Sequence, residues 1–336
     1  MGKYLSIIAE IGSVHDGSFG NAKNLIEAAA KSGATAVKFQ THLADDETLA
    51  DALEPSYFKS EPRMDYFRRT GFNTDQWLEL ANVCQSNGVE FLSSPFSLEA
   101  VDLLEKVGIN RYKIPSGEVT NLPLLEKVGK LGKPVLLSSG MSSWQELDAA
   151  VEAILDGGAP LTVMQCSSCY PCPPDKVGLN VMLEMKQRYD VPVGYSDHTS
   201  GMAACLAAVT LGAVVVEKHF TFSRLMYGSD ARHSMEPDKF AELSEALRET
   251  RAIISNPVDK SVVTDYTEMK RVFQKSIVAA RDLQKDTALT KCDLAFKKPG
   301  IGVGAENYRS FLGRRLICDV SKDDFILEEH VTRLKE

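Results

Sequence analysis

The feature that most constrains this chain is a regular alternation of short, β-branched apolar runs with amphipathic helical patterns. The strand-like runs are residues 5–12, 36–42, 89–96, 111–118, 134–140, 161–168, 191–199 and 214–221. Helical patterns lie between them, and several of these close on a glycine. Eight such units predict an α/β fold of the (β/α)8 TIM-barrel type. A doubly wound sheet is the alternative, but the G-x-G-x-x-G turn that often follows its first strand is missing here.

The chain divides into a large and a small predicted domain. We expect the barrel over residues 1–256, a polar, proline-containing linker over 257–275, and a separate small domain over 276–336. A domain of that size has a marginal core of its own. Residues 43–75 form a long insertion after the second strand, which predicts either a lid over the barrel mouth or a solvated surface loop.

Composition excludes several classes of function. A net charge of −8 without a Lys/Arg-rich block argues against nucleic acid as a partner. No apolar run approaches the ~20 residues of a membrane span, and the N-terminus resembles a core strand rather than a signal peptide. Seven cysteines, an odd number, are typical of a reducing compartment, so we expect a cytoplasmic protein.

Three of these cysteines, Cys166, Cys169 and Cys172, have the C-x2-C-x2-C spacing that opens an iron–sulfur run. Such a run needs a fourth cysteine at position 176, where this chain has Lys176. Cys166 lies within the sixth predicted strand and the other two in the loop after it. We therefore interpret the spacing as coincidental.

Polar side chains gather where the predicted strands end, which is the catalytic face of a TIM barrel. A single polar residue there is most often a cap or turn residue, but a set spread over all eight strands favours a site. The set is Glu10, Lys38, Gln40, His42, Ser93, Ser94, Lys113, Ser116, Glu118, Ser138, Ser139, Ser167, Ser168, Tyr170, Ser196, Asp197, His198, Lys218 and His219.

Two histidines and two lysines of this set carry specific predictions. His198 and His219 end neighbouring strands, and two imidazoles with open positions suit Zn²⁺, Mn²⁺ or a similar divalent ion. Lys38 and Lys113 lie in apolar strands, where an ammonium group needs an anion. That anion is either a phosphate or carboxylate ligand or a glutamate, in the pairs Lys38–Glu10 and Lys113–Glu118.

These motifs, in order, resemble those of the sialic acid synthase family, and the last 60 or so residues resemble its antifreeze-like (SAF) domain. The motifs are IAEIG with HDG, VKFQTH, FLSSPFS, YKIPSGE, LLSSGM, QCSSCYP, GYSDHT and EKHFT. The resemblance implies a transferase that condenses phosphoenolpyruvate with an N-acetylmannosamine-type sugar aldehyde. The products would be a nonulosonic (sialic) acid and phosphate, released by C–O cleavage. It also implies a domain-swapped homodimer, with no membrane or nucleic-acid partner.

The resemblance assigns roles to particular residues. It implies that His198 and His219 hold Mn²⁺ or Mg²⁺ and that Glu10 and Glu118 are acidic catalytic groups, with their individual roles open. Lys38 is assigned both to catalysis and to substrate binding. Substrate binding is also assigned to Gln40, Ser94, Lys113, Ser116, Ser139, Ser168, Tyr170, Ser196, Asp230 and Lys298.

The sequence departs from the family pattern at three positions. Val14 replaces an asparagine, Ser168 replaces the asparagine of some relatives, and Lys298 replaces an arginine that contacts the N-acetyl group. Because lysine lacks the bidentate fork of arginine, the acyl substituent of the sugar stays open. A diacetamido sugar of the legionaminic or pseudaminic type is an alternative substrate. A Schiff-base aldolase and a non-catalytic carbohydrate-binding relative are further alternatives.

Overall fold

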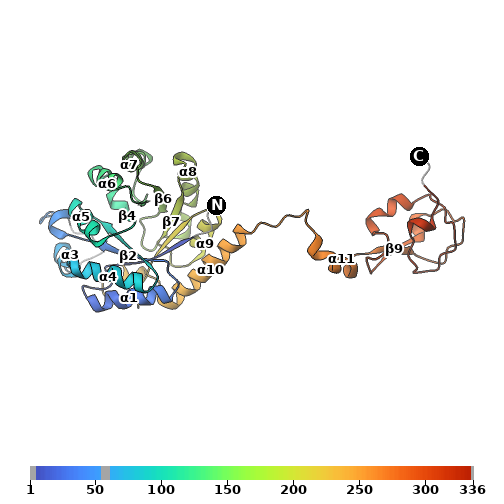
Figure 1. Ribbon diagram of the computed structural model, residues 1–336, viewed down its shortest axis with the longest axis horizontal. Coiled ribbons are helices and arrows are strands. Elements are labelled where there is room, and N and C mark those ends of the chain that lie inside the picture. The colour runs from blue at the N-terminus through green and yellow to red at the C-terminus, as the bar shows by residue number, and fades with distance from the viewer. Residues whose placement is uncertain (1–4, 54–60, 334–336) are drawn as a thin grey trace. The chain divides into compact units, whose positions relative to one another are not determined.

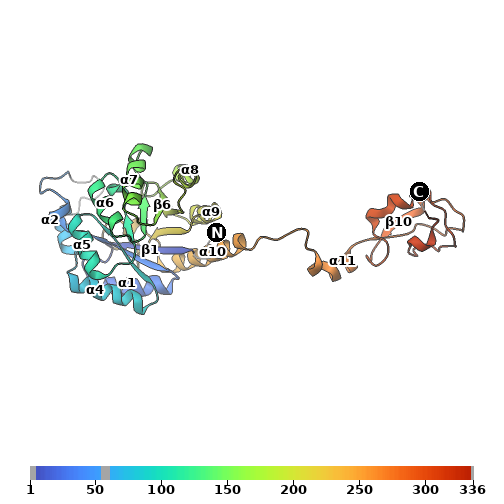
Figure 2. The same ribbon diagram turned by 45° about the horizontal axis from the view of Figure 1, so that its top comes forward.

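The computed structural model describes residues 5–53 and 61–333 and divides the chain into two compact units, residues 1–257 and 258–336. In the first unit eight parallel strands close into a barrel in the order β1 to β8, each paired with its neighbours in sequence and β8 with β1 (Figures 1 and 2). The strands are β1 (Ser6–Gly12), β2 (Ala36–Thr41), β3 (Glu90–Pro95), β4 (Tyr112–Ile114), β5 (Val135–Ser138), β6 (Leu161–Cys166), β7 (Val193–Asp197) and β8 (Val215–His219).

Helices follow the strands and surround the barrel, as Figure 2 shows for α4 to α9. One major helix follows each strand: α1 (Phe19–Lys31), α4 (Thr74–Ser86), α5 (Leu98–Val107), α6 (Leu122–Lys130), α7 (Trp144–Asp156), α8 (Leu179–Tyr189), α9 (Ala203–Thr210) and α10 (Pro237–Ser255). The prediction of a TIM barrel is therefore confirmed. No helix of the described ranges is long and apolar enough to cross a membrane.

Local sequence explains where these helices begin and which face they bury. In α7, Ser143 caps the N-terminus and exchanges hydrogen bonds with Glu146, a reciprocal capping box. Leu147, Ala150, Val151 and Ile154 then face the barrel at helical spacing and are buried. The same arrangement, repeated around the barrel, leaves the loops after the strands free to carry chemistry.

The insertion after β2 contains two short helices, α2 (Ala44–Glu47) and α3 (Arg63–Thr70). Its residues 54–60 lie outside the described residues. Tyr66 and Phe67 of α3 pack with Ala44 of α2 into a small apolar cluster of their own. The prediction for the fourth strand extended too far, because β4 ends at Ile114 and Ser116–Glu118 form a 3₁₀ turn.

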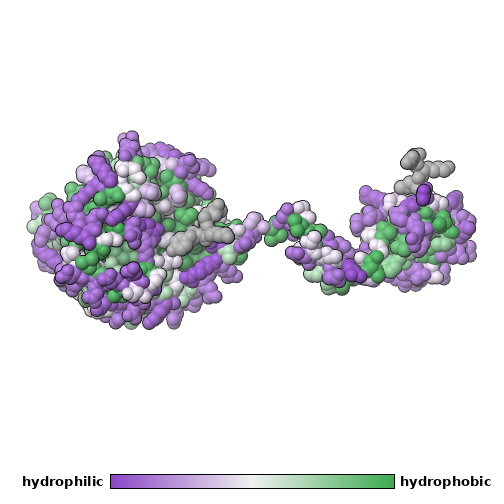
Figure 3. Space-filling model, viewed as in Figure 1, coloured by the Kyte–Doolittle hydropathy of each residue, from purple (hydrophilic) through white to green (hydrophobic). Residues whose placement is uncertain are grey.

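The second unit contains α11 (Thr267–Phe273) and a two-stranded antiparallel sheet of β9 (Ser276–Ala279) and β10 (Leu294–Lys297). It has its own apolar core, which includes Ile277, Phe311 and Ile326. Apolar side chains also gather on the exposed segment that leads into it (Figure 3). Met269 and Phe273 of α11 are more than half exposed.

Candidate active site

A cavity of about 910 Å³ opens at the carboxyl ends of the barrel strands. Most of the residues singled out from the sequence line it. They are Glu10, Lys38, Gln40, Lys113, Ser116, Ser168, Tyr170, Ser196, His198, His219 and Asp230. Because these side chains come from six different strands or the loops after them, only the closed barrel brings them to one space.

Two lysines and two glutamates form a buried cluster of charges at the floor of the cavity. Lys38 Nζ lies 2.7 Å from Glu10 Oε2 and 4.0 Å from Glu217 Oε1, and Lys113 Nζ donates to Glu217 Oε1 at 2.9 Å. No side chain of the four is more than 6% exposed. We call Glu10, Lys38, Lys113 and Glu217 the charge quartet. It balances two ammonium groups against two carboxylates.

The partner predicted for Lys113 is wrong: Lys113 pairs with Glu217 rather than with Glu118. Glu217 was absent from the residues chosen from the sequence. A signal for it exists in the alternation of β8, because Glu217 lies two residues before His219 and therefore points to the same side of the strand. An acidic residue at that position of an otherwise apolar strand needs a buried cation.

The two carboxylates of the quartet have opposite proton affinities. Burial opposes ionisation of Glu217, but Lys113 and Lys38 outweigh it and lower its pKa to about 2. Burial raises the pKa of Glu10 to about 7, since the opposing pull of Lys38 is weaker and the charge of Glu217 adds to the rise. Glu217 is thus a fixed negative charge, whereas Glu10 can take up or release a proton near neutral pH.

The two histidines face one another across the cavity wall, with ring centroids 5.5 Å apart. His198 Nδ1 donates to the carbonyl oxygen of Ser167 at 2.7 Å, which leaves its Nε2 lone pair for a ligand. Burial lowers the pKa of His219 to about 4, so this ring is neutral, and its buried Nδ1 has no hydrogen-bond partner among the described residues. This pair fits a divalent ion with open coordination positions.

Over residues 5–53 and 61–333, no group of three or more His, Cys, Asp or Glu side chains is arranged to hold a metal. An ion at His198 and His219 would therefore take its remaining ligands from water or substrate.

Serine hydroxyls form a second feature of the cavity wall, close to Gly140. A Cβ atom at Gly140 would lie 2.4 Å from Ser168 Oγ and 2.6 Å from Ser116 Oγ, so only glycine fits there. Ser196 Oγ donates to Glu217 Oε1 at 3.0 Å. Hydroxyl groups beside two ammonium groups can bind the oxygens of a phosphate or carboxylate.

Three of the predicted site residues in the first unit, Ser94, Glu118 and Ser139, do not line the cavity. Lys38 Nζ donates to Ser94 Oγ at 3.3 Å, and Ser139 Oγ donates to Gln165. Glu118 accepts a hydrogen bond from Asn121, and burial, then the charge of Glu47, raises its pKa. Lys298 belongs to the second unit, where its ammonium lies 5.1 Å from the centre of the Phe273 ring.

The cysteines of the sixth strand and its loop are free thiols. Cys166 and Cys172 are buried and Cys169 is exposed. Cys166 Sγ lies 3.9 Å from His198 Nδ1, so this thiol packs beside the histidine pair. The loop also carries Tyr170, whose ring lies 4.1 Å from that of His198.

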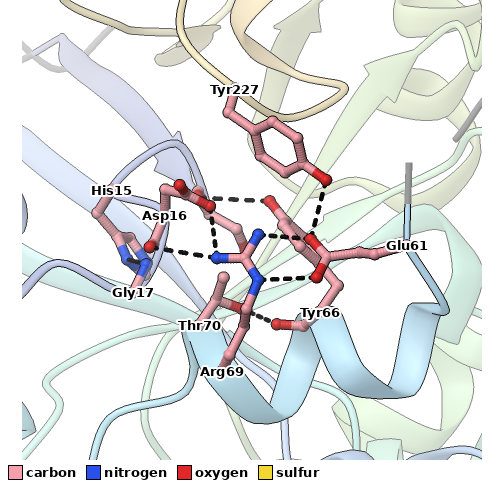
Figure 4. A network of polar contacts seen from close by, with 9 residues as sticks. His15, Asp16, Gly17, Glu61, Tyr66, Arg69, Thr70 and Tyr227 are labelled. Atoms are coloured by element: carbon pink, nitrogen blue, oxygen red, sulfur yellow. Dashed lines mark hydrogen bonds and ion pairs between the residues drawn. The ribbon is translucent and has the colours of Figure 1, made fainter. Parts of the chain in front are cut away.

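An ionic network ties three loops together at the rim of the cavity (Figure 4). Arg69 of α3 binds both carboxylate oxygens of Glu61 and one of Asp16, and the Tyr227 hydroxyl also donates to Glu61. Asp16 follows β1 and Tyr227 follows β8, so the insertion links the first and last βα loops. We call Arg69, Glu61, Asp16 and Tyr227 the rim network.

Comparison with known proteins places these features in a family. A model described as the NeuB family matches residues 25–259, and a SAF domain model matches residues 274–332. N,N'-diacetyllegionaminic acid synthase of Campylobacter jejuni subsp. jejuni is 36% identical over 330 residues, covering 96% of this chain and 98% of that protein. N-acetylneuraminate-9-phosphate synthase of Homo sapiens is 33% identical over 332 residues, covering 97% and 92%.

A solved structure shows the same similarity in three dimensions. The crystal structure of the N-acetylneuraminic acid synthetase from Leptospira borgpetersenii serovar Hardjo-bovis, in complex with citrate, matches with a TM-score of 0.72. Its sequence identity is 28%, and the match covers 80% of this chain and 92% of that one.

Proposed function

This chain belongs to the NeuB family of sialic acid-type synthases and is an enzyme, and from that premise we propose which reaction it catalyses. The reaction joins phosphoenolpyruvate to the open-chain aldehyde of an N-acetylmannosamine-type sugar. The products are a nonulosonic acid and inorganic phosphate. The charge quartet carries this proposal, because it sets two ammonium groups beside hydroxyl groups in a cavity that also contains a histidine pair.

Phosphoenolpyruvate is anionic at both its phosphate and its carboxylate, and the cavity offers cationic partners for the two groups together. Lys38 and Lys113 neutralise these charges, while Ser116 and Ser168 donate hydrogen bonds to the oxygens. Both ammonium groups are already held by Glu10 or Glu217, so they need no rearrangement when the substrate binds. This fixed arrangement orients the enol carbon toward the aldehyde.

His198 and His219 would hold a divalent ion, Mn²⁺ or Mg²⁺. When bound, the ion supplies Lewis-acid polarisation of the aldehyde oxygen. Asp230 contributes a carboxylate on the same side of the cavity, where it binds hydroxyl groups of the sugar. A Cβ at Gly12, whose φ is +54°, would lie 3.0 Å from Asp230 Oδ2 and 3.2 Å from Gln40 Nε2, which explains the glycine.

We assign the proton transfer to Glu10. As C3 of phosphoenolpyruvate bonds to the aldehyde carbon, positive charge develops at C2 and a water molecule adds there, giving up a proton to Glu10. The tetrahedral intermediate then expels phosphate by cleavage of its C–O bond, and its hydroxyl proton leaves with the phosphate. Glu10 returns its proton to the former aldehyde oxygen, which becomes a hydroxyl group of the 2-keto acid. A pKa of about 7 suits a group that both accepts and returns a proton. Glu118 does not line the cavity, so it is the weaker candidate.

The identity of the sugar is the part of the proposal with a close alternative. A diacetamido sugar of the legionaminic type uses the same chemistry, and Lys298 in place of arginine is compatible with either acyl pattern. A Schiff-base aldolase is disfavoured, because Lys113 is ion-paired with Glu217 and an ammonium group lacks the lone pair that an imine requires.

We further propose a domain-swapped homodimer in the cytoplasm. The second unit has a small core, and apolar side chains of α11 are exposed, as expected of a segment that packs on another surface. Mixing Glu10→Gln with Lys298→Ala protein tests the swap. Recovery of up to a quarter of the wild-type rate on re-association supports it, whereas two inactive variants that stay inactive together contradict it.

The reaction itself is tested with phosphoenolpyruvate and a panel of 2-acetamido and diacetamido hexoses, measuring phosphate and product mass. We expect one sugar to give stoichiometric phosphate and a product equal in mass to both substrates plus water minus phosphate. Release of pyruvate without a condensation product would contradict the proposal.

A further inference from the structure

A histidine outside the substrate and metal groups lies at the end of a hydrogen-bond chain that reaches the charge quartet. His42 follows β2 and is 8% exposed. Its ring is stacked between Phe67 and Phe96, with centroid distances of 3.8 Å and 4.0 Å and interplanar angles of 7° and 22°. Two aromatic faces fix the plane of the imidazole, so its nitrogens can point in only two directions.

Each ring nitrogen of His42 faces an acceptor. Nδ1 lies 2.8 Å from Glu47 Oε1, and Nε2 lies 3.1 Å from the amide oxygen of Gln40. The amide nitrogen of Gln40 in turn donates to Glu10 Oε1 at 2.7 Å. The chain therefore runs from Glu47 through His42 and Gln40 to Glu10.

The two contacts of His42 are satisfied together by one form of its ring. A carboxylate and an amide oxygen are both acceptors, so a ring that donates from both nitrogens, an imidazolium ion, meets both contacts. Its side chain is 5% exposed and that of Glu47 is also 5% exposed, so the cation is matched by a buried carboxylate. Charged groups near this pair, among the described residues, include Glu118, whose proton affinity the charge of Glu47 increases, and Arg63, whose guanidinium lies 5.1 Å from the centre of the Phe67 ring.

The amide of Gln40 has two possible orientations, and His42 selects one. With an imidazolium beside it, the amide oxygen must face His42 and the NH₂ group must face Glu10. A neutral His42 that donates to Glu47 would present a lone pair at Nε2, which attracts the NH₂ group instead. The amide oxygen would then face the Glu10 carboxylate, and Glu10 Oε1 would lose its donor while Oε2 keeps Lys38.

We propose that Glu47 and His42 are positioning residues for the reaction, acting as a buried ion pair that locks Gln40 with its NH₂ group toward Glu10. Neither residue needs to touch the reacting atoms. The insertion after β2 then has a defined purpose, since its helix α2 supplies Glu47 and α3 supplies Phe67. This inference rests on the proposed function, in which Glu10 transfers the proton.

The test compares Glu47→Gln with Asp45→Asn, a matched control on the same helix whose side chain is 74% exposed and ion-paired with Arg68. Glu47→Gln keeps the shape of the side chain and removes its charge. We expect kcat to fall about 10- to 100-fold with little change in KM, the size of losing one hydrogen bond to a charged group. Glu47→Asp should recover most of the loss, and Asp45→Asn should match wild type.

A second measurement does not depend on turnover. ¹⁵N-histidine NMR at neutral pH reports the protonation of each ring, and the signals that disappear in His42→Gln are assigned to His42. We expect both ring nitrogens of His42 to be protonated in wild type and only one in Glu47→Gln. A wild-type His42 with a single N–H overturns the proposal, even if Glu47→Gln does not fold. So does a folded Glu47→Gln with the kcat of Asp45→Asn. If wild type shows no turnover with any sugar, the proposed function fails, and the NMR result alone then supports or overturns the role of His42.

Discussion

Two ionic clusters lie at different depths of the same cavity, and they differ in what surrounds them. In the charge quartet the side chains of Lys38 and Glu10 are 4% and 2% exposed, whereas in the rim network Arg69 is 38% exposed. The distances are similar, at 2.7 Å for Lys38–Glu10 and 2.6 Å for Arg69–Asp16. Distance alone therefore does not tell which cluster matters energetically.

Burial determines how much each cluster contributes to the free energy of unfolding. A buried charge that loses its partner stays in a medium of low dielectric, so removing one member of the quartet leaves an uncompensated ion. An exposed charge that loses its partner is solvated by water, and its interactions are screened by salt. The quartet should thus tolerate almost no change, while the rim network should tolerate most.

Glu217→Ala should have the largest effect on stability. It leaves Lys113 with no partner among its observed contacts and Lys38 with Glu10 alone, so we expect the free energy of unfolding to fall by about 3–5 kcal/mol. Urea unfolding followed by circular dichroism measures this. A loss below about 1 kcal/mol, the range of exposed pairs, would remove the distinction between the two clusters.

Glu10→Gln should have the largest effect on catalysis, and the fold should stay intact because Lys38 keeps its ion pair with Glu217. The amide cannot accept the proton of the attacking water, so kcat should fall about 10²- to 10⁴-fold. Glu118→Gln is the matched control, because it makes the same change outside the cavity lining. An equal loss in both variants would contradict the assignment of the proton transfer to Glu10.

Metal binding should depend on both histidines. We expect Mn²⁺ binding, followed by electron paramagnetic resonance of the free ion, to weaken at least about tenfold in His198→Ala and in His219→Ala. His233→Ala, which changes another histidine lining the cavity, is the control. Unchanged Mn²⁺ affinity in either ligand variant would place the ion elsewhere.

His15 is buried and precedes Asp16 of the rim network in the chain, so the pH dependence of stability tests the effect of its burial. Burial lowers the pKa of His15 to about 4 from an ordinary value of 6.5, so the unfolded chain binds the proton more readily. The stability linked to His15 is therefore complete above pH 6.5 and is lost as the pH falls to 4, by about 3 kcal/mol. His15→Gln should flatten this part of the stability–pH curve. An identical slope in wild type and variant would contradict it.

Arg69→Met should have the smallest effect of the series. Its partners Asp16 and Glu61 are solvated after the change, so we expect a loss of about 1 kcal/mol or less, and a smaller one at high salt. Glu242→Gln, in an exposed pair with Lys239 on α10, is the control. A loss as large as that of Glu217→Ala would mean that the rim network is structurally essential.

The sequence predicted the barrel because strand–helix alternation depends only on local patterns. It also predicted most cavity residues, since polar groups at the ends of apolar strands converge once the barrel closes. Glu217 was missed because only the polar residues at strand ends were considered. Side chains alternate along β8, so Lys218 forms a buried ion pair with Asp197, whereas Glu217 points into the barrel and pairs with Lys113. The predicted Lys113–Glu118 pair was wrong because a 3₁₀ turn after β4 directs Glu118 toward Asn121, and no periodicity reports such a turn.

His42 shows a different limit of sequence reasoning. It had no visible partner in the sequence, yet in the fold it is held by Glu47, five residues further on, and by two phenylalanines from separate loops. Only the path of the insertion brings these groups together.

The most direct test of the proposed reaction uses phosphoenolpyruvate labelled with ¹⁸O in the oxygen that bridges C2 and phosphorus. Water attack at C2, assisted by Glu10 on the floor of the cavity, predicts that the label leaves with the phosphate, because the C–O bond breaks. Label retained in the 2-keto acid would mean that the P–O bond breaks instead, and would contradict the roles given to Glu10 and the charge quartet.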